Sequence, residues 1–373
     1  PVNFLMRIAF DSQIFAMQKY GGISRYICSL AQELSLHSSV DVRVVAPLHI
    51  NSYLSALPAT LVLGQRLPAI PNTAKLLYAA NLALSWPPTK YFRPNIVHQT
   101  YYLPITYVPK GAGRVVTVYD MIHERFSSIG SLNSRLSIWK KQAILQADHV
   151  ICISENTRRD LLDIFEIDES KVSAVHLGFE RFVAPMSLSN RGREQDGNPY
   201  ILYVGERSGY KNFSGFLRAF SNSPWLRQNF RVICFGGGSL QANEHRLISE
   251  LGIPEHQVSQ IGGGDDKLAA YYRGAAAFVY PSCYEGFGIP PLEAMSLDCP
   301  VICSNTSSIP EVVGAAAEYF DPHDSDSIRS ALERALGSPE RCRELVTLGR
   351  ERYTRFTWGR CADATMEMYR SLS

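Results

Sequence analysis

The chain has 373 residues, of which 46% are hydrophobic and 19% charged, so it can bury a large core and is closer in length to two domains than to one. A formal net charge of +2, without zinc-finger or ribonucleoprotein-like motifs, disfavours nucleic acid as the main partner. The sequence has no run of 18 apolar residues and no export signal, and most of its eight cysteines lie in apolar runs. We therefore expect a cytoplasmic protein with reduced core thiols and no metal site.

Short apolar runs alternate with helical patterns throughout the first half of the chain. The apolar runs are MRIAF, VDVRVVAP, NIVHQ, RVVTVYD and DHVICIS, and the helical patterns include SRYICSLAQEL and SRLSIWKKQAILQA. Such alternation is typical of βαβ units and predicts a first parallel-sheet domain over residues 1–183. His98, which lies in one of these runs, is expected to pack in the core or at the sheet edge.

A polar segment rich in Gly and Pro at 183–198 predicts a linker, after which the same rhythm begins again. YILYVG, RVICFGGG, AAAFVYP and PVICSN predict a second domain over 197–355, and a helical pattern at 356–373 is predicted to return to the first domain. The fold class is thus α/β, with two Rossmann-like, doubly wound parallel sheets. Ligands of such sheets bind beyond the carboxyl ends of the strands, so a cleft between the domains is the expected site.

In the first half, the residues after two predicted strands carry the candidate chemistry. Gly21 and Gly22 begin a helix and let backbone N–H groups approach an anion, although a plain glycine turn, taken alone, explains them better. Asp120 and His123 follow RVVTVY, where a carboxylate and an imidazole can hold substrate hydroxyls. Asp120 as a turn cap and His123 as an ordinary surface residue are the alternatives.

In the second half, the loop after YILYVG holds Gly205, Arg207 and Lys211. Arg presents a planar fork of donors and Lys a point charge, so the two together suit a diphosphate. A solvated turn explains either cation alone.

The stretch YPSCYEGFGIPPLEAM places two glutamates around a glycine turn at the start of a helix. Prolines in the first helical turn fix where the helix begins, and Gly286 and Gly288 free the backbone before it. The N–H groups from Phe287 to Ile289 can then face an anion. Glu293 lies one helical turn inside the helix, where its carboxylate can accept hydrogen bonds from both hydroxyls of a ribose. Glu285 precedes the glycine turn.

Residues 258–322, which contain this stretch, resemble the nucleotide-binding domain of retaining GT-B glycosyltransferases of family 4. The E-x7-E motif of that family is present as Glu285 and Glu293, and GGISRY, VYDMIHERF, ISENTRRDLL and VGERSGYKN are similar to family segments in family order. The resemblance implies transfer of a sugar from a nucleoside diphosphate sugar with retention of configuration, without a metal or other cofactor.

The resemblance also implies residue roles. Lys211 and Arg207 would neutralise the leaving diphosphate, while Gly21 and Gly22 would approach it from the other domain. Glu293 would hold the ribose, and Glu285 with the backbone of Gly286, Phe287, Gly288 and Ile289 would support the donor sugar and phosphates. Many relatives have His-Asp where this chain has Tyr119-Asp120, so either Tyr119 or His123 is expected to contact the donor sugar. Asp298 stands where the family usually has glycine.

GGISRY and YDMIHERF look most like bacterial mannosyltransferases of surface polysaccharide assembly, which implies GDP-mannose as donor and a lipid-linked oligosaccharide as acceptor. Residues 74–93 mix apolar side chains, Trp86 and cations, as in a helix lying at a membrane interface, or else in an amphipathic helix packed on its own sheet. Peripheral contact with the inner face of the cytoplasmic membrane is therefore an open expectation. The alternatives are a UDP-sugar donor, a sugar-nucleotide epimerase, a non-catalytic sugar-nucleotide-binding scaffold and, on weaker grounds, a nicotinamide-dependent oxidoreductase.

Overall fold

A computed structural model describes residues 5–71, 73–126, 134–181, 199–207 and 209–372. The chain divides into two compact units, residues 1–178 with 357–373, and residues 179–356. The predicted linker at 183–198 lies outside the described residues.

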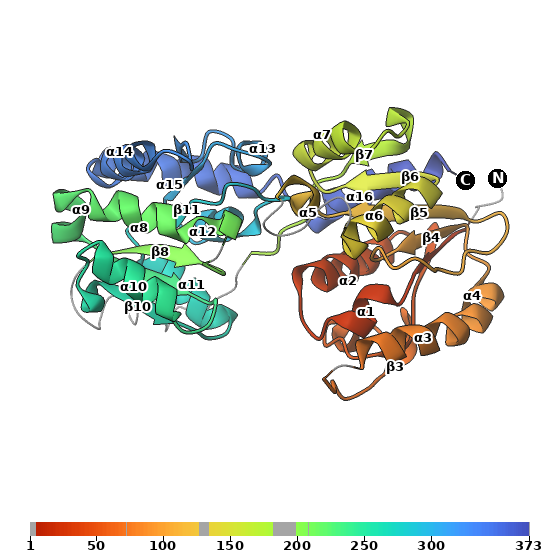
Figure 1. The fold of residues 1–373 in the computed structure, drawn as a ribbon. Helices are drawn as coiled ribbons and strands as arrows, with labels where there is room; N and C mark the ends of the chain where they lie inside the picture. The colour runs from red at the N-terminus through yellow and green to blue at the C-terminus, as the bar shows by residue number, and fades with distance from the viewer. Residues whose placement is uncertain (1–4, 72, 127–133, 182–198, 208, 373) are drawn as a thin grey trace. The chain divides into compact units, whose positions relative to one another are not determined.

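The first unit is built on a parallel sheet in the order β3-β2-β1-β4-β5-β6-β7 (Figure 1). Apolar, β-branched residues dominate its central strands, and every residue of β4 and β6 is buried, as parallel strands covered on both faces require. The strands are β1 (Met6–Phe10), β2 (Val40–His49), β3 (Val62–Arg66), β4 (Ile96–Gln99), β5 (Gly113–Val118), β6 (His149–Cys152) and β7 (Val172–Ala174).

Helices connect these strands, and the last helix of the chain, α16, belongs to the same unit and packs against α2. Ser134, Ser154 and Thr357 cap α6, α7 and α16 through their side-chain oxygens, which fixes where these helices begin. The helices are α1 (Gln13–Met17), α2 (Gly22–Leu34), α3 (Ala74–Leu84), α4 (Trp86–Phe92), α5 (Ile122–Arg125), α6 (Arg135–Gln146), α7 (Glu155–Ile164) and α16 (Trp358–Arg370).

The second unit repeats the design with a parallel sheet in the order β10-β9-β8-β11-β12-β13. Its strands are β8 (Tyr200–Val204), β9 (Arg231–Phe235), β10 (Val258–Ile261), β11 (Ala277–Tyr280), β12 (Val301–Ser304) and β13 (Glu318–Phe320). Its helices are α8 (Phe213–Ser221), α9 (Pro224–Asn229), α10 (Ala242–Glu250), α11 (Asp265–Gly274), α12 (Ile289–Ser296), α13 (Ile309–Val313), α14 (Ser325–Leu336) and α15 (Pro339–Tyr353).

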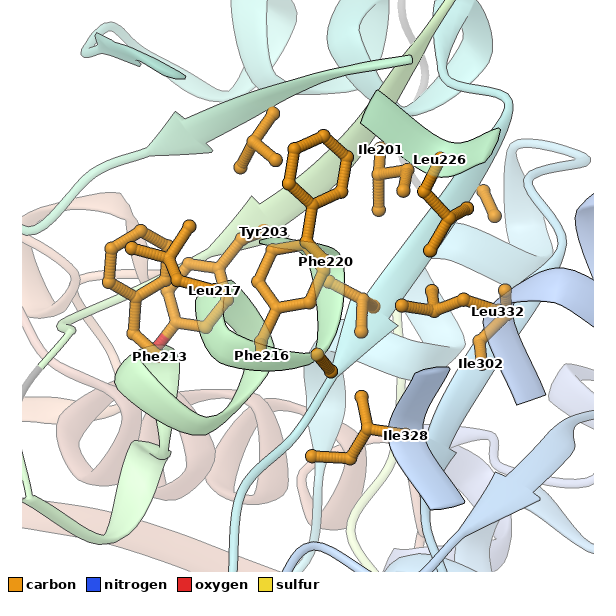
Figure 2. Packing of buried hydrophobic residues seen from close by; sticks show 14 of the residues in the cluster. Ile201, Tyr203, Phe213, Phe216, Leu217, Phe220, Leu226, Ile302, Ile328 and Leu332 are labelled. Atoms are coloured by element: carbon orange, nitrogen blue, oxygen red, sulfur yellow. The ribbon is translucent and has the colours of Figure 1, made fainter. Parts of the chain in front are cut away.

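A hydrophobic cluster that includes three phenylalanines of α8 forms the core of the second unit (Figure 2). Phe213, Phe216 and Phe220 lie one turn apart on α8 and are at most 1% exposed, and they pack with Ile201 and Tyr203 of β8. Burying each such side chain contributes roughly 1.5–3 kcal/mol. The core therefore anchors α8 firmly, together with the loop that precedes it.

In both sheets the order of consecutive strands reverses at one point, between β1 and β4 in the first sheet and between β8 and β11 in the second. The predicted fold of two doubly wound parallel sheets is confirmed. Ligands of such sheets bind beyond the carboxyl ends of the strands at this reversal. The loops after β8 and β11 in the second unit, and those after β1, β4 and β5 in the first, are therefore the places to look for a site.

In the part of the chain that the structure describes, no helix is long and apolar enough to cross a membrane.

Candidate functional site

The loop after β8 carries Lys211 on a short 3-10 helix, Gly209–Lys211. Lys211 Nζ lies 2.7 Å from Glu285 Oε1, and the Lys211 side chain is 23% exposed. Burial lowers the pKa of Lys211, but the charge and hydrogen bond of Glu285, with Tyr210, outweigh it, so this pKa is raised. Lys211 therefore remains protonated at neutral pH. It supplies a fixed positive charge at the point where the strand order of the sheet reverses.

Gly205 begins the same loop with φ of +115°, a conformation that favours glycine, and its N–H donates to the Phe235 carbonyl. A Cβ at Gly205 would meet no atom within 4 Å. The backbone conformation, rather than crowding, therefore explains why glycine stands here.

The loop after β11 is the glycine turn from Glu285 to Gly288. Gly288 has φ of +107° and is the N-cap of α12, whose first turn contains proline. These features put the N-terminal end of α12, where the helix dipole favours an anion, on the same loop as Glu285.

Two serines after β12 fix this turn, and neither was predicted from the sequence. Ser307 Oγ accepts from the Glu285 N–H at 2.9 Å, while Ser308 Oγ donates to the carbonyls of Glu285 and Phe287 at 2.8 and 2.9 Å. The sequence does show that both serines follow a buried strand. It does not show that this strand, β12, lies next to β11 in the sheet.

Glu293 lies one turn inside α12 and is half-buried. Its Oε2 accepts a hydrogen bond of 3.1 Å from the hydroxyl of Tyr272, a buried residue of α11. Burial and the Glu293 charge raise the pKa of Tyr272 well above its usual value, so its hydroxyl remains a donor. The carboxylate is thereby oriented at the beginning of the helix that also carries the glycine turn.

Arg207, on the same loop as Lys211, is buried. Its side chain is only 2% exposed, and its guanidinium pairs with Glu244 at 2.7 Å. The remaining N–H groups donate to the carbonyls of Gly236, Gly237, Gly238 and Ser239, at 2.9 to 3.3 Å. The role of Arg207 in neutralising the diphosphate beside Lys211 stays a prediction, and in this structure its guanidinium holds the glycine loop after β9.

In the first unit, the loop after β5 places the Asp120 side chain at the surface, 33% exposed. Its Oδ1 accepts from the Ile122 N–H at 3.1 Å, which is the turn-capping contact considered in the sequence analysis. Beneath it, Lys140 Nζ donates to the Asp120 carbonyl at 2.9 Å and to Glu124 Oε2 at 2.8 Å, and both charged side chains are buried. This ion pair was not predicted, because α6 shows no sign in the sequence of turning a lysine inward.

Tyr119 and His123 flank Asp120 differently. Tyr119 is 7% exposed, and its hydroxyl donates to the Thr100 carbonyl at 3.1 Å. Because this hydroxyl already donates its proton to a backbone carbonyl, it is poorly suited to donate a hydrogen bond to a donor sugar. His123 lies half-buried on the short helix α5, one turn from Asp120.

Gly21 and Gly22 begin α2 as predicted. A Cβ at Gly21 would lie 2.3 Å from Gln18 Oε1, whereas a Cβ at Gly22 would meet no atom within 4 Å. Tyr26 of the same helix packs edge-on against Tyr119, with ring centroids 5.9 Å apart. The start of α2 and the loop after β5 are thus tied together within the first unit.

Among the described residues, no group of three or more His, Cys, Asp or Glu side chains is arranged to hold a metal ion. Within the second unit, the structure brings together Lys211, Glu285 and the glycine turn. The first unit gathers Asp120, Tyr119 and His123 on one loop.

Two family models match the chain and together span nearly all of it. The model described as Glycosyltransferase Family 4 matches residues 20–181, and that described as Glycosyl transferases group 1 matches residues 187–352.

Curated relatives include the O-antigen chain mannosyltransferase B of Escherichia coli, which is 26% identical over 94% of this chain and 96% of its own length. The serotype-specific mannosyltransferase WbdA of Escherichia coli is 29% identical over 69% of this chain, which spans 33% of WbdA.

Among solved structures, sucrose-phosphate synthase from Thermosynechococcus elongatus has a TM-score of 0.77 at 20% identity, covering 98% of this chain and 99% of its own. Anabaena HepE, solved in complex with UDP and glucose, has a TM-score of 0.72 at 16% identity, covering 98% and 100%. These likenesses confirm the two-sheet fold.

Proposed function

Since the chain belongs to the family 4 glycosyltransferases of the GT-B fold, we propose that it is a retaining mannosyltransferase that uses GDP-mannose and a lipid-linked oligosaccharide in surface polysaccharide assembly. The observation that carries the proposal is the Lys211–Glu285 pair beside the glycine turn at the start of α12. The names of the relatives, mannosyltransferases of O-antigen synthesis, support mannose and this kind of acceptor.

In the proposed reaction, the bond between the anomeric carbon and the diphosphate oxygen breaks, and its electron pair leaves with the phosphate. An acceptor hydroxyl forms the new bond on the same face of the sugar, and its proton passes to the departing phosphate oxygen. The protein must therefore stabilise the negative charge that develops on the diphosphate. Such electrostatic stabilisation is usually the largest single contribution of an active site to the rate.

Lys211 suits this task because its raised pKa keeps it cationic and its position is fixed by Glu285. The N–H groups from Phe287 to Ile289 add donors and the positive end of the α12 dipole. With these groups supplying the charge, we propose that transfer needs no metal and no other cofactor, and that activity survives a chelator.

Each unit supplies its own residues to this proposal. Glu293 accepts the ribose hydroxyls, and Tyr272 orients it. In the first unit, Asp120 is the surface carboxylate that accepts a hydroxyl of the sugars, with His123 beside it, and Gly21 and Gly22 offer N–H groups to the donor phosphates.

The first experiment is a thermal-shift comparison of GDP, UDP, ADP and dTDP, because a ligand that binds the folded protein raises its Tm. GDP alone should raise the Tm. A selective shift with UDP would overturn the GDP-mannose assignment, while the same site would remain the place of donor binding.

The second experiment incubates the protein with radiolabelled GDP-mannose and a lipid-linked oligosaccharide, with and without EDTA. Label should move to the acceptor equally in both. Conversion of the free sugar nucleotide without an acceptor would instead indicate an epimerase. GDP binding without transfer to any lipid-linked acceptor would favour a sugar-nucleotide-binding scaffold.

A further inference from the structure

The charges in the first unit are distributed very unevenly along the chain. Between Asp41 and Asp120 the sequence has no Asp or Glu, whereas residues 42–119 include seven Lys and Arg. This segment contains α3 and α4 and the strands β3, β4 and β5. An anionic partner is therefore the only kind that its charge complements.

Exposed apolar side chains lie in the same segment. On α3, Leu76, Ala79, Ala83 and Leu84 are exposed together with Lys75, so the outward face of this helix is apolar apart from one cation. Leu76 is 70% exposed and Leu84 47%. Helices that face water normally show charged residues there, so this face resembles one that is covered by something apolar.

Trp86, at the start of α4, lies at the centre of this region. It is 46% exposed, Lys90 Nζ lies 4.8 Å from its ring centroid, and the Tyr107 ring lies 6.2 Å away. Tyr91 is 91% exposed and Ile105 58%. We call the six residues Leu84, Trp86, Lys90, Tyr91, Arg93 and Ile105 the Trp86 surface.

Two open hollows share Trp86 as a wall. One is also lined by Arg7, Arg43, Lys90 and Arg93, and the other by Arg114. Guanidinium and ammonium groups around an aromatic side chain suit phosphate-bearing head groups, which need hydrogen-bond donors and positive charge.

The carboxylates described beside these hollows are already engaged. Asp41 pairs with Arg43 at 2.5 Å, and Asp148 accepts from the Arg114 N–H at 2.7 Å. Arg7, Lys90 and Arg93 therefore leave the surface with a net positive charge.

We propose that the Trp86 surface docks on an anionic lipid bilayer. Trp and Tyr favour the level of the head groups, where one end of the ring is apolar and the other wet, and nearby Lys and Arg attract anionic lipids. A second copy of this chain would bring the same cations face to face, which charge repulsion opposes. This proposal does not depend on which sugar nucleotide is the donor. It adds one point to the proposed function, namely that the protein meets its lipid-linked acceptor at the membrane.

The test is flotation of the full chain with vesicles of phosphatidylcholine alone or with 30% phosphatidylglycerol, without donor or acceptor. Binding should require phosphatidylglycerol and weaken as salt rises, because salt screens surface charges. Lys90→Glu with Arg93→Glu, and Trp86→Ser with Tyr91→Ser, should each reduce the bound fraction at least tenfold at fixed lipid.

Matched controls lie in the second unit. Trp225→Ser replaces a Trp that is 38% exposed, and Arg246→Glu with Arg343→Glu reverses two cations whose side chains are 74% and 70% exposed. Both controls should float like the unaltered protein. All variants should keep their GDP-induced Tm shift. A loss of membrane binding is therefore distinguishable from a loss of donor binding.

Equal binding to phosphatidylcholine alone, or no binding to either vesicle, would overturn the proposal. So would a dimer in light scattering that Trp86→Ser dissociates, because the surface would then join two copies of the chain.

Discussion

At the scale of single residues, Lys211 is the cation that the proposed reaction depends on. Lys211→Ala should reduce kcat by about 10²–10³-fold, the loss seen when one group that stabilises developing negative charge is removed. The mutation also leaves Glu285, which is 8% exposed, without its partner, so some loss of stability is expected as well.

Steady-state kinetics with GDP-mannose, measured well below the Tm of the variant, separate the two effects. Lys267→Ala is the matched control, because Lys267 is an exposed lysine of the same unit that donates only to the Gly262 carbonyl. The control should stay within twofold of the unaltered protein. A kcat for Lys211→Ala within threefold of normal would contradict the proposed role.

Arg207 leads to the opposite expectation. Because its buried guanidinium pairs with Glu244 and donates to four consecutive carbonyls, Arg207→Met should lower the free energy of unfolding by about 2–4 kcal/mol. Urea denaturation measures this loss. Unchanged stability combined with lost GDP binding would mean that Arg207 contacts the diphosphate, as the family resemblance implied.

At the scale of elements, the buried Lys140–Glu124 pair joins α6 to the loop that carries Asp120. Lys140→Met leaves Glu124 charged in a buried position and should cost about 3–5 kcal/mol of stability. The double variant Lys140→Met with Glu124→Gln removes both charges, and so should be more stable than Lys140→Met alone. Urea unfolding of both variants and of Glu124→Gln completes the cycle, and additive losses would show that the pair is not coupled.

The two doubly wound sheets could be predicted because alternating apolar runs and helical patterns report βαβ units directly. Lys211 and the Glu285–Gly288 turn could be placed at strand ends for the same reason. The partners of Arg207 could not, because they depend on β8 and β9 being neighbours in the sheet, so that the loops after both strands meet. Ser307, Ser308 and Lys140 were missed for a similar reason, since each acts through a neighbour distant in sequence.

Asp298 is a smaller case of the same kind. It has φ of +59°, a left-handed conformation that favours glycine. This conformation explains why members of the family usually have glycine at that position. Here its carboxylate instead pairs with Arg350 through two hydrogen bonds of 2.7 and 2.8 Å, from α15. The ion pair offsets part of the backbone strain, a compensation that the sequence does not reveal.

At the scale of the whole molecule, the chain leaves its first unit and ends in it. His98 of β4 is fully buried, as expected, and its ring contacts the hydroxyl of Tyr369 on α16 and Thr117 Oγ1 of β5, the latter at 2.8 Å. The side chain of Trp358, at the start of α16, lies so close to Gly178 that a Cβ there would be 2.4 Å from it. Residues some 270 positions apart thus complete one core, and the first unit is complete only when α16 is in place.

This arrangement makes the first unit sensitive to acid. Burial lowers the pKa of His98 to about 3, from an ordinary value of 6.5. Between these two values the unfolded chain binds a proton that the folded chain does not, so stability falls as pH decreases from about 6.5 towards 3. The expected loss from His98 is about 1.4 kcal/mol per pH unit once the pH is well below 6.5. His98→Gln should be less stable at pH 7 but should lose less stability on acidification.

Urea unfolding at pH 7, 6, 5.5 and 5 measures the difference, followed by tryptophan fluorescence, since Trp86, Trp139 and Trp358 all lie in the first unit. His245→Gln is the control, because His245 is an exposed residue of α10 in the second unit. Carboxylates also titrate at the lower pH values, so the informative quantity is the gap in free energy of unfolding between the unaltered protein and His98→Gln. That gap should narrow steadily from pH 7 to pH 5. A gap that stays constant would show that folding does not lower the pKa of His98, and that its contact with Tyr369 does not depend on a neutral ring.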